Sequence, residues 1–98
     1  MASTKDYRDF VLGQLNVLDD ITYKPMMGEY LFYYKNVLFG GLYDDRFLVK
    51  KVENNKKYNM EDAIPYNGAK QMYLVDDIDN LETLKNIVID TYEGLIKI

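Results

Sequence analysis

Aspartate, glutamate, lysine and tyrosine are the side chains that could carry acid–base chemistry in this sequence, because its 98 residues include neither histidine nor cysteine. Triads that contain histidine, cysteine nucleophiles, disulfides and zinc sites built on these two residues are therefore excluded. Ser3 is the single serine, and neither a phosphate-binding loop nor a nucleophile elbow is present. We expect no enzymatic activity, no catalytic residue and no cofactor.

Glu29 is the carboxylate placed best for acid–base work. It lies between Gly28 and Tyr30 among apolar residues, where a buried carboxyl group would suit a general acid. An exposed turn residue between two strands is the preferred interpretation, because Gly28-Glu29 carries turn chemistry.

Three pairs of aspartates contain the oxygen ligands that magnesium and calcium prefer: Asp19-Asp20, Asp44-Asp45 and Asp76-Asp77. Each pair lies where a turn or a helix cap is expected, which aspartate favours without a metal. None follows the spacing of a calcium-binding loop. We therefore predict no metal site.

One dense basic group stands out in a chain of net charge −4, and it consists of Lys50, Lys51, Lys56 and Lys57. A solvated loop is the preferred interpretation of this candidate basic patch. The alternative is a weak phosphate-contacting surface that binds nucleic acid together with tyrosines of the sheet. The acidic balance of the whole chain argues against direct nucleic-acid binding.

The elements that must position these residues follow from hydrophobic spacing. Apolar side chains at helical spacing predict helices at both ends, and Ser3-x-x-Asp6 and Asp79-x-x-Glu82 resemble capping boxes. Short turns between aromatic and β-branched runs predict an antiparallel meander. The expected order is helix 4–18, strands 21–27, 30–34, 37–43 and 46–51, loop 53–62, strand 69–75 and helix 81–97. This is a two-layer α+β fold whose helices pack on one face of the sheet.

Two features of the meander bear on function. Gly40-Gly41 lies inside a strand, which indicates a bulge or the close approach of another backbone. Both faces of the strands carry apolar side chains, whereas two helices cover only one face. We therefore expect a partner on the second face, most simply another copy of the chain in a homodimer. The candidate interface residues are Tyr30, Phe32, Tyr34 and Leu42.

The longest nearly uncharged apolar stretch runs from Val37 to Tyr43, which is far shorter than a membrane span. The first six residues lack the apolar run of a signal peptide. We expect a cytoplasmic protein that does not enter the membrane.

Several short motifs give the sequence a family resemblance. Pro25 to Tyr30 reads PMMGEY, Phe39 to Lys50 reads FGGLYDDRFLVK, and Pro65-Tyr66-Asn67-Gly68-Ala69-Lys70 is followed by Met72-Tyr73. Together they resemble the N-terminal domain of the TfoX/Sxy family, bacterial regulators of natural competence. The positions that carry the first part of the resemblance are Pro25, Met26, Met27, Gly28, Glu29, Gly40, Gly41 and Lys50.

The resemblance implies an α+β fold with an antiparallel sheet and no enzymatic activity. Competence regulators of this family act with a cyclic-AMP receptor protein at promoters and carry a second, C-terminal domain, for which this chain has no room. We therefore expect residues 1–98 to form a single stand-alone TfoX N-terminal-like domain. Its expected role is regulatory and rests on protein–protein contacts, with a second copy or another regulatory protein as partner.

Overall fold

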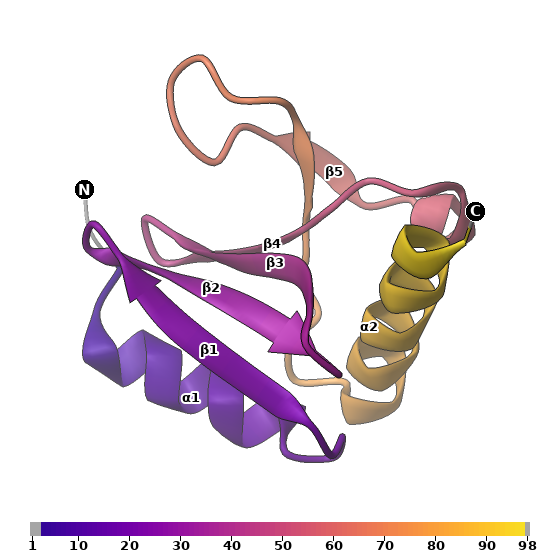
Figure 1. Cartoon of the computed structure of the whole chain (residues 1–98), viewed down its shortest axis with the longest axis horizontal. Coiled ribbons are helices and arrows are strands. Elements are labelled where there is room, and N and C mark those ends of the chain that lie inside the picture. The colour runs from indigo at the N-terminus through magenta and orange to yellow at the C-terminus, as the bar shows by residue number, and fades with distance from the viewer. Residues whose placement is uncertain (1–2, 98) are drawn as a thin grey trace.

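The computed structural model of the chain describes residues 3–97, which form two α-helices, a short 3-10 helix and six strands (Figure 1). In chain order these are α1 (Lys5–Leu15), β1 (Ile21–Met26), β2 (Glu29–Tyr34), β3 (Val37–Tyr43), β4 (Arg46–Val49), η1 (Glu53–Tyr58), β5 (Glu61–Ala63), β6 (Met72–Leu74) and α2 (Leu81–Ile96).

The six strands form one antiparallel sheet with the order β1-β2-β3-β4-β6-β5. The predicted four-strand meander and the two terminal helices are confirmed. The sequence interpretation missed β5, because Glu61, Asp62 and Ala63 form a short polar strand without a buried apolar side chain. β5 lies at the sheet edge beside β6, which pairs with β4.

One hydrophobic core lies between the sheet and both helices, so the α+β fold with helices on one face is confirmed. α1 contributes Val11 and Leu15 to this core, and α2 contributes Leu84, Ile87 and Val88. The sheet contributes its inner face, defined by Tyr30, Phe32, Tyr34, Phe39, Leu42, Phe47 and Val49. Figure 1 shows α1 beneath β1 and β2, and the long loop between β5 and β6 on the opposite side of β3 and β4.

The four predicted interface residues belong to this inner face, so that prediction was wrong. Phe32 and Leu42 are fully buried, and Tyr30 and Tyr34 are less than a tenth exposed. The Tyr34 ring meets the Tyr92 ring of α2 edge to face at 5.0 Å between centroids. These side chains are covered by the helices of their own chain.

A β-bulge in β3 changes which residues of this strand face the core. Phe32 lies opposite Gly40, whereas Tyr33 lies opposite Leu38, so Phe39 is an extra residue in β3. The extra residue shifts the alternation of β3 relative to β2 and brings Phe39 to the same side as Phe32. The Gly40-Gly41 prediction is confirmed in both of its forms, a bulge and a close backbone approach.

The N-cap of each helix lies one residue after the predicted one. Thr4 caps α1 by accepting a hydrogen bond from the Tyr7 N–H at 3.2 Å, and Asn80 caps α2 by accepting from the Thr83 N–H at 3.1 Å. The predicted caps Ser3 and Asp79 do not make these bonds. Ser3 is buried and has another set of partners, described below.

A buried polar cluster joins η1 to α2. The Asn55 side chain is fully buried, donates to the carbonyl oxygen of Lys50 and to the Thr91 hydroxyl at 2.8 Å each, and accepts from the Val52 N–H. The Thr91 hydroxyl in turn donates a hydrogen bond to the Ile87 carbonyl oxygen. This cluster fixes the backbone that leaves β4, because buried polar groups must keep their partners.

Tyr58 makes folding stability sensitive to high pH. Its burial and the hydrogen bond that it donates to Asp90 raise its pKa from the ordinary 10.0 to about 12. Since the unfolded chain loses this proton near pH 10 and the folded chain keeps it, the Tyr58 contribution is complete below pH 10 and is lost between about pH 10 and about pH 12.

We expect Tyr58→Phe to reduce this loss of folding stability at high pH. Urea unfolding across that pH range should show a smaller fall in the free energy of unfolding for the variant than for the wild type. Tyr7 and Tyr43, whose pKa values are also raised by burial, titrate in both proteins, so the difference between the two curves reports Tyr58. Parallel curves would contradict this assignment.

Candidate functional site

The face of the sheet opposite the helices is only partly covered. Register places Leu31 beside Gly41 and Leu48, and Tyr33 beside Leu38, on this outer face. Leu31, Tyr33 and Leu38 are half-buried, whereas Leu48 is fully buried outside the main core cluster. The uncovered part of the outer face therefore lies over β1 to β3.

The segment 64–71, which joins β5 to β6, covers the other part. The Arg46 guanidinium donates to the Ile64 carbonyl oxygen at 3.0 Å and so holds the start of this segment against β4. The Tyr66 ring lies 6.3 Å from the Tyr43 ring, centroid to centroid. Tyr43 is buried under this contact, and the pKa of its hydroxyl is raised, first by burial and then by Tyr66.

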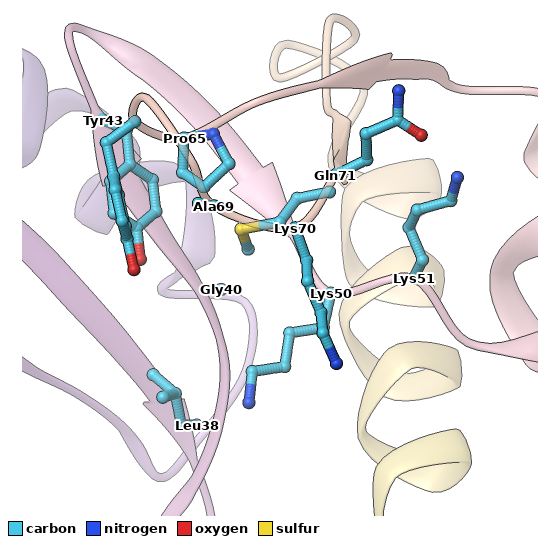
Figure 2. A pocket seen from close by; sticks show the side chains of 11 residues that line it. Leu38, Gly40, Tyr43, Lys50, Lys51, Pro65, Ala69, Lys70 and Gln71 are labelled. Atoms are coloured by element: carbon cyan, nitrogen blue, oxygen red, sulfur yellow. The ribbon is translucent and has the colours of Figure 1, made fainter.

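A cavity of about 520 Å³ opens between this segment and the outer face. Its size is that of a ligand or side-chain pocket rather than of a packing defect. We call it the outer pocket, and Figure 2 shows the side chains that line it. They are Leu38, Gly40, Tyr43, Lys50, Lys51, Pro65, Tyr66, Ala69, Lys70, Gln71 and Met72.

The charge of the outer pocket is positive, since its lining includes three lysines and no acidic residue. The Lys51 ammonium points away from those of Lys50 and Lys70 in Figure 2. It forms an ion pair with Asp62 at 2.8 Å and lies over the Tyr73 ring. Within residues 3–97, Lys50 and Lys70 have no ion pair, so they supply the uncompensated positive charge of the pocket.

The backbone at Lys50 is held from two sides. Its N–H donates to the Phe39 carbonyl at 2.9 Å, and its own carbonyl accepts from the buried Asn55 side chain. Lys50 is therefore presented from rigid backbone, whereas Lys70 lies exposed on the covering segment. Because the strands and the loop are already held in place, binding of a ligand does not carry the entropic cost of ordering them.

The candidate basic patch divides in the structure. Lys51, Lys56 and Lys57 each face a carboxylate: Lys51 pairs with Asp62, Lys56 with Glu53 at 3.0 Å, and Lys57 with Asp90 at 3.2 Å. Lys50 and Lys51 both line the outer pocket, and Lys50 has no carboxylate partner within residues 3–97. The structure thus places Lys50 and Lys51 at the outer pocket, and Lys56 and Lys57 in η1.

Glu29 has a structural role at the start of β2, beside the turn between β3 and β4. Its carboxylate accepts from the Ser3 N–H at 3.0 Å, from the Ser3 hydroxyl at 2.8 Å and from the Asp44 N–H at 3.2 Å. Asp45 accepts from the Thr4 N–H at 2.7 Å. We call this group the N-terminal clasp, because it ties the chain before α1 to the turn between β3 and β4.

Glu29→Ala should destabilise the fold by about 1–2 kcal/mol, because the clasp donors lose their acceptor at a half-buried site. Glu29→Gln keeps one acceptor oxygen and should lose less. The exposed Glu93→Ala variant is the control. Urea unfolding measures all three, and equal stability of the Glu29 and Glu93 variants would rule out the clasp.

Other candidate groups of the sequence are placed in turns or caps. Asp44 and Asp45 both adopt positive φ in the β3–β4 turn, and Asp20 does so before β1. No three potential metal-ligating side chains gather within residues 3–97. In the same range, no helix combines the length and the apolar character that crossing a bilayer requires.

Sequence reasoning missed most of the outer pocket. Tyr66 and Lys70 were not among the predicted site residues, because segment 64–71 was interpreted only as a turn and a strand. A signal was nevertheless present. The motifs behind the family resemblance fall at two places, with PMMGEY and Asp44-Asp45 around the N-terminal clasp, and Pro65 to Met72 around the outer pocket.

Comparison with known proteins gives one informative relative. The chain is similar to a protein of Spirochaeta aurantia described as an uncharacterized 12.7 kDa protein in the trpE 5' region. The two are 32% identical over 80 residues, which is 80% of this chain and 70% of the relative. No family model and no solved structure matches the chain.

Proposed function

We propose that this chain, which belongs to the same family as the uncharacterized 12.7 kDa protein of Spirochaeta aurantia, is a non-enzymatic regulatory domain that works through protein–protein contacts. Its contact surface is the outer face of the sheet, formed by Leu31, Tyr33, Leu38 and the outer pocket. We place it in the cytoplasm. The resemblance of its motifs to the TfoX/Sxy N-terminal domain supports the regulatory part of this proposal.

The observation that carries the proposal is an apolar sheet face left uncovered beside a pocket. Leu31, Tyr33 and Leu38 stay half-buried on the side away from both helices, and the outer pocket continues this surface under segment 64–71. Aromatic and aliphatic side chains around a pocket are typical of the central part of a protein interface.

The carboxylates support a binding role over catalysis. Glu29, which was the best candidate acid, accepts hydrogen bonds from Ser3 and Asp44 and so serves the N-terminal clasp. The lining of the outer pocket contains lysines and tyrosines but no carboxylate, and the nearby Glu29, whose charge acts on Tyr43, is engaged by the donors of the clasp. The pocket chemistry thus suits recognition of a partner.

Site-specific photo-crosslinking in living cells tests this proposal. A benzophenone amino acid in place of Tyr33 on the outer face should give discrete protein adducts. The same group in place of the exposed Glu93 of α2 should give none. Adducts of equal yield from both positions, or adducts from position 93 alone, would contradict the outer face as the contact surface.

Homodimer formation is a separate part of the proposal and has no assigned surface, because the residues first predicted for it lie in the core. The free edge strand β1 is a poor site for pairing of two sheets, since it carries Lys24 and Pro25. Sedimentation velocity over a wide concentration range decides between a dimer and a monomer.

A further inference from the structure

We infer that the outer pocket binds an extended acidic segment of another protein, with one bulky apolar side chain of that segment inserted between segment 64–71 and the sheet. This inference rests on the proposed function and names the partner chemistry at the same face. It joins two features of one cavity, its positive charge and its apolar lining.

The positive charge of the pocket favours a negatively charged partner. Lys50 and Lys70 stand at the pocket without ion pairs in the described part of the chain, and no carboxylate lines the cavity. Lys24 adds a third ammonium on the same face, where it lies over the Tyr33 ring. A partner that brings carboxylates therefore gains complementary charge, although this chain as a whole carries −4.

The apolar part of the lining favours insertion of a large apolar side chain of the partner, which we call the anchor. Leu38, Pro65 and Met72 form apolar walls, and Tyr43 and Tyr66 add two rings at one end. A cavity of about 520 Å³ accommodates an aromatic or large aliphatic side chain together with part of its own backbone. Such an anchor in a pocket is the usual source of affinity in a protein interface, and charged groups at its rim select the partner.

The same features disfavour the other occupants. In a symmetric contact between two copies, the Lys50 and Lys70 ammonium groups of both copies would face one another, which costs binding energy. Nucleic-acid binding relies on many phosphate contacts, whereas Lys51, Lys56 and Lys57 are already paired with carboxylates. An acidic peptide satisfies the two available lysines and fills the cavity as well.

Binding of a labelled peptide, followed by fluorescence anisotropy, tests the inference. The probe is a short peptide with glutamates on both sides of one phenylalanine. The comparison peptides replace the glutamates by glutamine or the phenylalanine by glycine, and a single-stranded oligothymidine is the nucleic-acid probe. The proteins are the wild type, the double variant Lys50→Gln/Lys70→Gln and the charge-matched control Lys56→Gln/Lys57→Gln.

We expect the Lys50/Lys70 variant to bind the glutamate–phenylalanine peptide at least about tenfold more weakly than the wild type, because two charge pairs are lost. The Lys56/Lys57 control should stay within about twofold, and both comparison peptides should bind more weakly. Lys70→Gln alone, at an exposed position, provides the same test if the double variant does not fold.

Three results would overturn the inference: no peptide binding to the wild type, equal weakening in the two double variants, or tighter binding of oligothymidine than of the peptide. The last result would support the nucleic-acid alternative instead. The photo-crosslinking experiment at Tyr33 does not depend on any of these results. Failure of the pocket assignment is therefore distinguishable from failure of the proposed function.

Discussion

Gly40→Ala is expected to destabilise the domain by about 3 kcal/mol or more, or to prevent folding, because the new methyl group has no space. A Cβ atom at this position would overlap the carbonyl oxygen of Leu48 and would lie only 3.0 Å from the Val49 Cα. Both atoms belong to the backbone of β4, so a side-chain rearrangement cannot relieve the contact. Gly41→Ala should behave in the same way, since its Cβ would overlap the Tyr30 carbonyl oxygen.

Gly13→Ala is the matched control for both variants. Gly13 lies exposed in α1, and no atom approaches the position of its added Cβ within 4 Å. Alanine should stabilise the helix there by about 0.5–1 kcal/mol, because glycine loses more chain entropy on folding. Thermal and urea unfolding measure all three variants. A Gly40 variant as stable as the wild type would show that β3 and β4 are not packed as described.

The second large effect is expected at Asn55, where Asn55→Ala should cost about 2–4 kcal/mol. The substitution removes a fully buried amide, so the buried Thr91 hydroxyl and the part-buried Lys50 carbonyl and Val52 N–H would lose this partner. It should also weaken peptide binding, since Asn55 holds the backbone that presents Lys50.

The neighbouring Asn54→Ala is the control, because the Asn54 side chain makes no hydrogen bond within residues 3–97 and belongs to the same turn of η1. Urea unfolding should separate the two variants clearly. If both variants lose the same stability, the hydrogen bonds of Asn55 between η1 and α2 do not stabilise the fold as proposed.

The elements that sequence reasoning predicted correctly are those with a strong local period. Helical stripes of apolar residues placed α1 and α2, because they reflect burial of one side of each helix. Short turns between aromatic and β-branched runs placed the meander. The Gly40-Gly41 pair also indicated the bulge, because glycine inside a strand often marks a bulge or the close approach of another backbone.

The faces of the sheet and the outer pocket needed information that no local pattern holds. The alternation in the sequence groups Tyr30, Phe32, Tyr34 and Leu42 on one face of the sheet, as the structure does, but it does not say which face the helices cover. The pocket joins Leu38 to Lys70 across a long stretch of chain, and it depends on how segment 64–71 folds back over the outer face. Tertiary contacts of this kind determine the site.

The central claim is that this domain binds partners through its outer sheet face, not through its helices. Nuclear magnetic resonance of the isotope-labelled domain, titrated with the glutamate–phenylalanine peptide, tests it most directly. We predict that amide shifts change around Leu38, Lys50 and segment 64–72, while those along α1 and α2 remain in place. Changes concentrated on α1 or α2, with none at Lys50 and Lys70, would contradict the claim.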